Sequence, residues 1–204
     1  MKTTLMYKFS KRLFDIFMSF FGIIFLSPIL LFIAVSVKFT SEGTILYRGE
    51  RSGLFGKSFN ILKFRTMVMN ADLGAGTTSR NDKRITYVGN ILRRYKLDEL
   101  PQLINVFFGD MSFVGPRPEL QKYTNQYQGE EKLILSVRPG ITDFSSVKFS
   151  NLNELIDDDN PDASFEKKIL SEKNRLRLQY VNECNFWLDI KLIFLTILRI
   201  TSIK

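Results

Sequence analysis

The longest apolar stretch of the chain lies near its N-terminus. Ile16 to Val37 spans 22 residues without a charged side chain, and as a straight helix it would just cross a bilayer core of about 30 Å. Ser27-Pro28 lies near the middle of this stretch, and proline removes a backbone hydrogen bond and clashes with the preceding turn. The pattern therefore predicts a membrane helix that is broken at Ser27-Pro28.

Both flanks of this stretch are basic. Cations precede it at Lys2, Lys8, Lys11 and Arg12, and others follow it at Lys38, Arg48, Arg51, Lys57, Lys63 and Arg65. A spanning helix would place one basic flank outside the cell, against the tendency of cations to remain inside. A re-entrant helix bends and returns to its own side, so both flanks stay cytoplasmic. The charges favour a re-entrant helix, with a spanning helix and a buried core helix as alternatives.

Short strands are expected after the apolar stretch. Thr44 to Arg48 is one candidate, and Ser58 to Met67 alternates as a half-buried strand does, with Lys63 and Arg65 on the same face. Two cations on one strand face are also typical of an ordinary solvated face. The polar, Gly-rich segment Asp72 to Asp82 predicts a loop.

The rest of the pattern is mainly helical. Ile85 to Tyr95 has apolar residues at helical spacing, and Arg93 lies off that stripe, facing either a site or solvent. Leu120 to Val137 is amphipathic. Phe165 to Asn182 predicts a charged helix on a protein or membrane surface, and the tail from Phe186 to Ile203 predicts a segment at the membrane interface or docked into the core. We expect an α+β fold, mainly helical: an N-terminal re-entrant membrane helix, then a compact cytoplasmic domain with short strands and amphipathic surface helices.

Charge narrows the choice of partner. The 204 residues suit one modest domain, with or without appendages. The formal net charge of +8, from 29 basic and 21 acidic residues, predicts an anionic partner such as a phosphorylated ligand, an anionic lipid or a nucleic acid. The long apolar stretch and the lack of a recognition-helix or aromatic stacking pattern argue against nucleic acid.

Two scarce residue types restrict the chemistry. The chain has no histidine, which excludes Ser-His-Asp and Cys-His catalysis and His-ligated metal sites. Its single cysteine, Cys184, excludes an internal disulfide framework and thiolate-rich metal sites. A base or nucleophile must therefore come from Asp, Glu, Lys, Ser, Thr or Tyr. A metal would be a hard cation on oxygen ligands, and Mg²⁺ is the natural choice where phosphates are involved.

The strongest candidate site lies between Arg93 and Glu119. Adjacent carboxylates, Asp98 and Glu99, follow a cluster of cations, and Arg117 is held between two prolines. This layout suits a site for a phosphorylated ligand in which a carboxylate is the reacting group. Two acids shortly before a proline are also typical of a helix N-terminus, where carboxylates cap free N–H groups. The two interpretations are compatible, because a helix N-terminus also binds phosphate.

Longer motifs connect the chain to a known family. They are KRLFD (11–15), SP (27–28), KFRTM (63–67), ITYVGNILRRYKLDELPQLINVFFGDMSFVGPRPE (85–119), RPGIT (138–142) and LDIKLIFLTI (188–197). On these motifs the chain resembles the bacterial sugar transferase family, the small monotopic polyprenol-phosphate phosphoglycosyl transferases. The resemblance covers nearly the whole chain.

The resemblance implies a reaction and its site. The family transfers a sugar 1-phosphate from a UDP-sugar to undecaprenyl phosphate, releases UMP, depends on Mg²⁺ and forms a covalent aspartyl phosphosugar. By position, Asp98 would be the nucleophile and a magnesium ligand, and Glu99 its partner. Phosphate or nucleotide groups would be bound by the Pro116-Arg117-Pro118 turn, Arg93 and Lys63, with Arg65 as a further candidate on the strand.

The resemblance also implies a location. Ser27 and Pro28 would break the re-entrant helix, so that residues 1–40 anchor the protein in one leaflet at the cytoplasmic face of the bacterial inner membrane. Residues 41–204 would form the cytoplasmic catalytic domain with its membrane-surface helices. A catalytically silent membrane-surface scaffold is the alternative function, and the intact Asp98, Glu99 and Arg117 argue against it.

Two positions depart from the family pattern. Asp143-Phe144-Ser145-Ser146 stands where a glycine and a small polar run are expected, and Arg177 stands where an acid is expected. The C-terminal third of the family is thought to help select the sugar. These departures therefore leave the donor sugar open.

Overall fold

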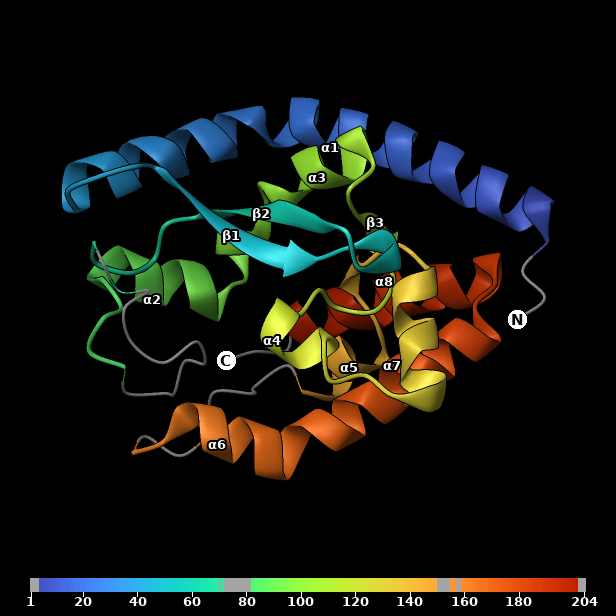
Figure 1. Ribbon diagram of the computed structural model, residues 1–204. Helices are drawn as coiled ribbons and strands as arrows, with labels where there is room; N and C mark the ends of the chain where they lie inside the picture. The colour runs from blue at the N-terminus through green and yellow to red at the C-terminus, as the bar shows by residue number, and fades with distance from the viewer. Residues whose placement is uncertain (1–3, 70, 72–81, 150–154, 157–158, 202–204) are drawn as a thin grey trace.

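In the computed structural model, one helix of 36 residues, α1 (Leu5–Thr40), arches over the rest of the chain (Figure 1). The structure describes residues 4–69, 71, 82–149, 155–156 and 159–201. Helices predominate in this part, with a few short strands, which confirms the coarse α+β, mainly helical prediction. Residues 72–81, most of the predicted Gly-rich loop, lie outside the described residues.

The helix α1 bends without breaking. Pro28 lies inside it and cannot donate a hydrogen bond to the carbonyl of Ile24. The Ser27 hydroxyl donates to that carbonyl instead, at 2.7 Å, so the freed backbone oxygen is satisfied locally. The expected break at Ser27-Pro28 is therefore corrected: α1 continues through these residues, and Figure 1 shows it as a bent rod with both ends turned toward the body.

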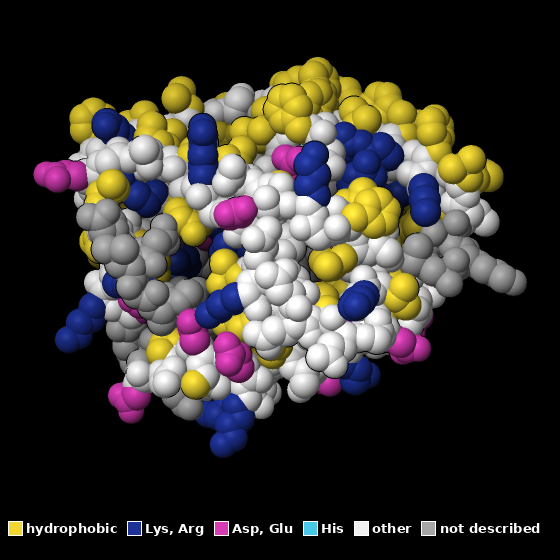
Figure 2. Space-filling model, in the orientation of Figure 1, with side chains coloured by type: hydrophobic (Ala, Val, Ile, Leu, Met, Phe, Trp, Pro, Cys, Tyr) yellow, Lys and Arg dark blue, Asp and Glu magenta, His cyan; other side chains and the backbone are white. Residues whose placement is uncertain are grey.

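One face of α1 packs on the body and the opposite face is apolar and exposed. Asp15, Ser19, Ile33 and Val37 are its buried residues. Figure 2 shows hydrophobic side chains along the edge where α1 runs, with Lys and Arg side chains directly beneath them. By length and composition, α1 is the one helix in the described ranges that could cross a membrane. Its large exposed apolar side chains include Phe9, Phe17, Phe21, Phe25, Phe32 and Phe39.

Both ends of α1 are tied to the same body. Near the N-terminal end, Lys11 donates to Asp189 at 2.7 Å, and Arg12 donates to the carbonyls of Val106 and Phe107 at 2.7 and 2.8 Å. At the C-terminal end, Arg65 donates to the carbonyl of Ser41 at 2.8 Å. These contacts fix α1 along its length.

Two small sheets lie beneath α1. The strands β1 (Leu46–Ser52) and β2 (Ser58–Phe64) form an antiparallel hairpin, in which Leu46 pairs with Phe64. Both strands were predicted, but β2 ends before Arg65. The strands β3 (Ser112–Val114) and β4 (Gly140–Thr142) pair in parallel. Glycine is required in β4 because a Cβ at Gly140 would clash with the backbone of Gly115.

Helices and helical turns surround these sheets. They are α2 (Tyr87–Arg94), η3 (Leu97–Glu99), α3 (Gln102–Phe108), α4 (Gln121–Thr124), η4 (Gly129–Ser136), α5 (Phe144–Lys148), α6 (Pro161–Phe165), the π-helical turn η6 (Glu166–Leu170), α7 (Ser171–Glu183) and α8 (Phe186–Thr201); a single 3-10 turn, η1 (Leu54–Gly56), joins β1 to β2. The predicted helices at 85–95 and 165–182 are confirmed. The tail docks through Asp189 and Leu192, which are buried, while Trp187 remains 79% exposed.

Apolar clusters brace the segment between α2 and α3. Ile33 and Val37 of α1 pack with Phe64 and Leu92. On the other side, Val106 of α3 packs in a cluster that also contains residues of β2. The turn that carries Asp98 and Glu99 is thus held between helices whose inner faces are buried.

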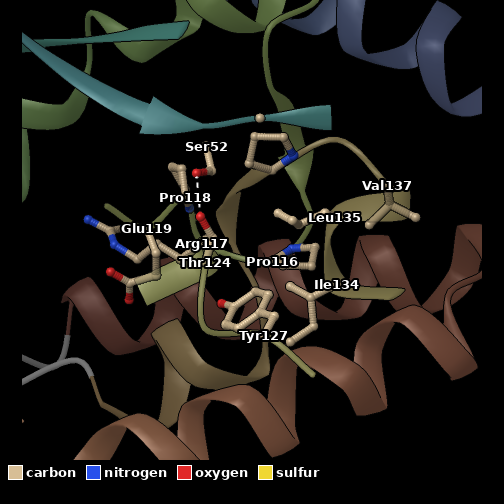
Figure 3. A pocket seen from close by; sticks show the side chains of 12 residues that line it. Ser52, Pro116, Arg117, Pro118, Glu119, Thr124, Tyr127, Ile134, Leu135 and Val137 are labelled. Atoms are coloured by element: carbon tan, nitrogen blue, oxygen red, sulfur yellow. Dashed lines mark hydrogen bonds between the residues drawn. The ribbon is translucent and has the colours of Figure 1, made fainter. Parts of the chain in front are cut away.

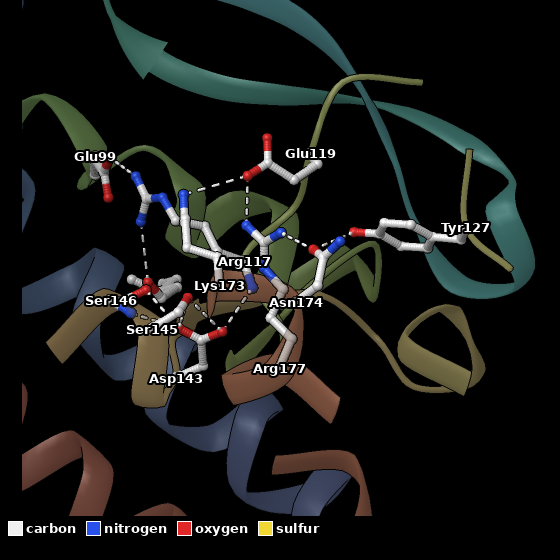
Figure 4. Close-up of polar contacts among 11 residues, drawn as sticks. Glu99, Arg117, Glu119, Tyr127, Asp143, Ser145, Ser146, Lys173, Asn174 and Arg177 are labelled. Atoms are coloured by element: carbon white, nitrogen blue, oxygen red, sulfur yellow. Dashed lines mark hydrogen bonds and ion pairs between the residues drawn. The ribbon is translucent and has the colours of Figure 1, made fainter. Parts of the chain in front are cut away.

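A buried ion cluster ties α7 to the segment after the Pro-Arg-Pro turn (Figure 4). Glu119 accepts from Arg177, which is fully buried, and from Lys173 at 3.3 Å. Burial raises the pKa of Glu119, but the charges of Lys173 and Arg177 outweigh it and lower that pKa to about 2. Burial lowers the pKa of Lys173 to about 8 despite its pairing with Glu119, and the positive charge of nearby Arg177 adds to this lowering. Glu119 therefore holds two buried cations, Lys173 and Arg177.

We predict that Glu119→Gln destabilises the fold by about 3–5 kcal/mol at neutral pH, because it leaves two buried cations without their carboxylate. In the wild type, this stabilisation is complete above the ordinary glutamate pKa of 4.5 and is lost as pH falls toward 2. Denaturant unfolding between pH 3 and 7 measures the free energy of unfolding. This free energy should fall as the pH falls for the wild type and should depend less on pH for the variant.

Glu172→Gln is the matched control, since Glu172 lies on the same helix but pairs with Lys148 and Arg175 at the exposed surface. Glu172→Gln should leave the denaturant concentration at the unfolding midpoint unchanged. Equal effects of the two substitutions would contradict the role assigned to Glu119.

Candidate active site

The two predicted carboxylates lie in a tight turn between α2 and α3. Lys96 adopts a left-handed conformation with φ of 57°, which is strained for a residue with a side chain. This conformation ends α2 and starts the turn η3, which contains Asp98 and Glu99. Pro101 takes the N-cap position of α3, and no side chain caps that helix. The carboxylates are therefore not N-caps of α3, which removes the purely structural interpretation of the Asp-Glu pair.

Glu99 gathers two cations from distant segments. Lys63 of β2 donates to its Oε1 at 2.8 Å, and Arg117 of the Pro-Arg-Pro turn pairs with the same oxygen. Burial raises the pKa of Glu99, but the charges of Arg117 and Lys63 outweigh it and hold that pKa well below its ordinary value. Glu99 is thus ionised, and its Oε1 is shared by two cations.

Asp98 is buried and partly unengaged. Its exposed fraction is 7%, and its Oδ1 has no hydrogen-bond partner within the described part of the chain. Burial and the adjacent Glu99 raise its pKa, while Lys63, Arg93 and Lys96 oppose that rise. A carboxylate held among cations with one free oxygen can act as a nucleophile or a metal ligand.

The Pro116-Arg117-Pro118 turn presents its cation to Glu99 (Figure 4). A small crevice beside the turn is lined partly by the apolar side chains of Ile134 and Leu135. Figure 3 shows the guanidinium of Arg117 pointing away from those apolar side chains. The prolines thus fix the backbone while the charged group faces the dyad.

Asp143 is a site residue that the sequence analysis missed. It accepts from the backbone N–H of Arg117 at 3.2 Å, and it caps α5 by accepting from the N–H of Ser146 at 2.7 Å (Figure 4). Asp143 therefore fixes Arg117 on the side away from Glu99. The signal was available as an aspartate shortly before two serines, an arrangement common at helix N-termini, at a position that departs from the family pattern.

Two further cations border Asp98. Arg93 donates to the Thr66 hydroxyl at 2.8 Å, and burial lowers its pKa against the attraction of Asp98. Burial likewise lowers the pKa of Lys96, against the attraction of Glu99. Arg93 was predicted as a site residue, whereas Lys96 was not among the predicted site residues. Lys63, Arg93, Lys96 and Arg117 thus surround two carboxylates.

Arg65 is not brought to this cluster. Its guanidinium donates to the carbonyls of Ser41 and Glu42 and to the Ser41 hydroxyl, at the C-terminal end of α1. The expectation that Lys63 and Arg65 act together assumed a strand through Met67. Because β2 ends at Phe64, the alternation stops and Arg65 is used to hold α1.

The oxygen ligands at this site suit a metal ion that is bound partly by the phosphates of a ligand. Within the described ranges, no three Asp, Glu or Cys side chains come together to hold an ion. Mg²⁺ is commonly held by one or two carboxylates together with substrate phosphates and water. The free Oδ1 of Asp98 is an oxygen ligand of the kind that would hold such a cation.

Comparison with known proteins gives a consistent result. The model of the bacterial sugar transferase family matches residues 6–202. The chain is 39% identical over 193 residues to the UDP-glucose:undecaprenyl-phosphate glucose-1-phosphate transferase of Escherichia coli K12, covering 93% of this chain and 39% of that protein. It is 34% identical over 204 residues to the UDP-N-acetylgalactosamine-undecaprenyl-phosphate N-acetylgalactosaminephosphotransferase of Aeromonas hydrophila, covering 96% and 44%.

A relative of similar length is the uncharacterized sugar transferase EpsL of Bacillus subtilis, 35% identical over 190 residues, with 93% of this chain and 86% of that protein covered. The chain therefore spans less than half the length of the Escherichia and Aeromonas enzymes and most of the length of the Bacillus protein.

We predict that Asp98 titrates above the ordinary aspartate pKa of 3.8, and that Glu99→Gln lowers the pKa of Asp98. The substitution removes the adjacent negative charge and leaves Lys63 and Arg117 free to attract Asp98. Carbon NMR titration of labelled carboxylates would measure this, with the Asp98 signal assigned by its loss in Asp98→Asn.

Glu50→Gln, at an exposed position of β1, should leave the Asp98 midpoint unchanged. An unchanged midpoint in Glu99→Gln would show that the charge of Glu99 does not act on Asp98.

Proposed function

The chain belongs to the bacterial sugar transferase family, and we propose that it transfers a sugar 1-phosphate from a UDP-sugar to undecaprenyl phosphate, releasing UMP. The observation that carries this proposal is the state of the dyad: Glu99 is engaged by two cations, while buried Asp98 keeps a free oxygen beside it. One carboxylate is positioned for structure and the other for chemistry.

The charges around the dyad support a diphosphate substrate. Four cations surround two carboxylates, and neither Arg93 nor Lys96 forms an ion pair in the described part of the chain. The diphosphate of a nucleotide sugar carries one negative charge on each phosphate, so it matches the surplus of positive charge. Preorganised cations of this kind stabilise charge that develops on the leaving phosphate.

The proposed reaction has two displacements. A carboxylate oxygen of Asp98 attacks the phosphorus that bears the sugar, the bond from that phosphorus to the bridging oxygen breaks, and UMP leaves with the bond electrons. The phosphate oxygen of undecaprenyl phosphate then attacks the same phosphorus and releases the Asp98 carboxylate. Neither displacement needs a histidine or a thiol.

Mg²⁺ is proposed as the cofactor, with Asp98 as its protein ligand. When bound, it would neutralise the diphosphate and make the phosphorus accessible to an anionic nucleophile. Arg93, Lys96 and Arg117 would orient the phosphates. Glu99, held by Lys63, keeps Arg117 in place.

The sugar on the donor is not assigned. The relatives named above carry glucose and N-acetylgalactosamine donors in their names, so membership in the family does not select one. Asp143 and Arg177, where the chain departs from the family pattern, lie on the segments that hold the Pro-Arg-Pro turn and Glu119.

We propose that α1 is re-entrant, so that the protein occupies one leaflet at the cytoplasmic face of the inner membrane. The attachments at its two ends support this, because Lys11 of α1 binds Asp189 of the body, and Arg65 of the same body binds Ser41 at the other end of α1. A spanning helix would have to pull that body into the hydrocarbon. The division into an anchor at 1–40 and a catalytic domain at 41–204 belongs to the same proposal, and the cations beneath the apolar rim in Figure 2 suit anionic lipid headgroups.

We expect Asp98→Asn to lower turnover by at least about 10³-fold, because it removes the nucleophile, and to leave membrane association intact. The assay is UMP release from a panel of UDP-sugars with undecaprenyl phosphate and Mg²⁺, in membrane fractions. Asp159→Asn, at an exposed position, is the matched control and should retain wild-type turnover.

Release of UMP with one donor would identify both the reaction and the sugar. Near wild-type release by Asp98→Asn would remove Asp98 from the nucleophile role. Absence of release with every donor, together with failure to trap a labelled aspartyl intermediate, would favour the silent scaffold.

The topology gives a separate prediction. In a Cys184→Ser background, single cysteines at exposed Lys8 and Lys38 should both be shielded from a membrane-impermeant thiol reagent added to intact spheroplasts. Both should react once the membrane is opened. Labelling of one position alone in intact spheroplasts would show a spanning helix.

A further inference from the structure

Gln102, at the start of α3, is a buried amide without partners. It is 1% exposed, and neither its Oε1 nor its Nε2 has a hydrogen-bond partner among the described residues. An unpaired buried polar group costs of order 1–3 kcal/mol, and native structures retain few of them. Both ends of one side chain are unpaired here, which calls for an explanation other than packing.

The position of Gln102 points to the site. Residues 97–108 form helical turns that Leu100 and Pro101 join without a break, both in right-handed helical conformation. Gln102 therefore follows Asp98 by about one turn of a continuous helical segment, whose backbone hydrogen bonds include Leu100 N–H to Leu97 and Leu103 N–H to Leu100. Asp98 Oδ1 is also buried and unpartnered among the described residues, so this one segment carries two buried side chains with unpaired polar atoms.

A second buried amide on the same helix, that of Asn105, has a structural role. Asn105 is also buried, at 3% exposure. Its Oδ1 accepts from the N–H of Leu62 at 2.9 Å, and its Nδ2 donates to the carbonyl of Asn60 at 2.9 Å. Asn105 thus joins α3 to β2 with both ends of its amide, and Gln102 does nothing comparable.

The unpaired atoms specify the chemistry of what binds between them. Asp98 Oδ1 and Gln102 Oε1 are two acceptors that need donors. Phosphate oxygens are acceptors and cannot supply them, whereas the water molecules that Mg²⁺ retains in protein sites are strong donors. The Nε2 group of Gln102 is a donor, and a phosphate oxygen held by the same cation would accept from it.

We propose that Gln102 is an outer-sphere partner of the cation that accompanies the donor diphosphate: its Oε1 accepts from metal-bound water, and Asp98 supplies a carboxylate oxygen. This inference rests on the proposed function and adds a residue to it. Among the described residues, no three carboxylates come together to hold a cation. The proposal accounts for this, because an amide and water take the place of further carboxylates.

The test measures Mg²⁺ binding apart from turnover. Purified full-length wild type and Gln102→Met are titrated with Mg²⁺ in the presence of UDP, which has the diphosphate of the donor, and thermal midpoints are recorded. Met has nearly the volume of Gln and no amide. Without Mg²⁺, the variant should unfold at the wild-type midpoint or above it, since two unpaired groups are gone. The Mg²⁺ concentration for half-maximal stabilisation should rise about 10–100-fold.

Asn105→Leu is the matched control, an isosteric loss of a buried amide on the same helix. It should lower the midpoint by about 5 °C, because Leu62 and Asn60 lose their partners, and leave the Mg²⁺ half-point unchanged. A fall of the Gln102→Met midpoint like that of Asn105→Leu would overturn the inference, because it would show a structural amide. So would an unchanged Mg²⁺ half-point in Gln102→Met.

Gln102→Glu provides a second variant of nearly equal shape. It keeps an acceptor at this position and places a second carboxylate near Asp98. Without Mg²⁺, Gln102→Glu should unfold at a lower temperature than the wild type. Mg²⁺ should stabilise it more than it stabilises the wild type. The Mg²⁺ concentration for half-maximal stabilisation should be no higher than that of the wild type. Equal increases of the half-point in Gln102→Met and Gln102→Glu would mean that shape alone matters, and would overturn the inference.

The two proposals fail separately. Wild-type release of UMP that requires Mg²⁺, with an unchanged half-point in Gln102→Met, overturns the role of Gln102 alone. Lack of UMP release with every donor, together with failure to trap a labelled aspartyl intermediate, overturns the proposed function. The titration with Mg²⁺ and UDP still decides whether Gln102 serves the cation.

Discussion

The pairing of Glu99 with two cations is the interaction on which the candidate site depends. Lys63 and Arg117 lie 36 and 18 residues away in the sequence, and one oxygen of Glu99 brings them together. Their charges keep Glu99 ionised in a buried place. With those cations engaged by Glu99, its neighbour Asp98 retains a free oxygen and a raised pKa. Two adjacent carboxylates in one turn thus acquire different tasks because their surroundings differ.

The membrane anchor and the site share their supports. α1 buries Ile33 and Val37 against the cluster that contains Phe64 and Leu92, from the strand that carries Lys63 and the helix that carries Arg93. Its C-terminal end is held by Arg65, directly after that strand. A displacement of α1 would therefore be transmitted to the segments that position the cations, since packed interiors do not deform freely. A reaction between a soluble donor and a lipid phosphate needs such a fixed relation between the membrane and the catalytic residues.

Much of this organisation could be predicted from the sequence, and the rest could not for identifiable reasons. The apolar stretch, the helix at 85–95 and the Asp98-Glu99 pair are local patterns, so periodicity and residue type were sufficient. The separation of Arg65 from Lys63 depends on where β2 ends, which pairing with β1 decides. Asp143 acts on Arg117 across two segments, and sequence spacing does not encode that distance. A break of α1 was predicted at Ser27-Pro28, but the helix continues there, because the Ser27 hydroxyl satisfies the carbonyl that the proline leaves free.

Gln102 shows why burial and satisfaction must be considered together. Sequence alone would make it an unremarkable polar residue at the start of a helix, and burial alone would assign it to the core with Asn105. Only the count of partners separates the two: Asn105 uses its amide to join α3 to β2, whereas Gln102 uses neither atom within the described part of the chain. A fold can retain an unsatisfied group when the surrounding packing compensates, and the buried Leu103 and Val106 on the same helix do so here. Unsatisfied polar atoms about one helical turn along the chain from a free carboxylate oxygen therefore indicate where the fold has given up stability for binding.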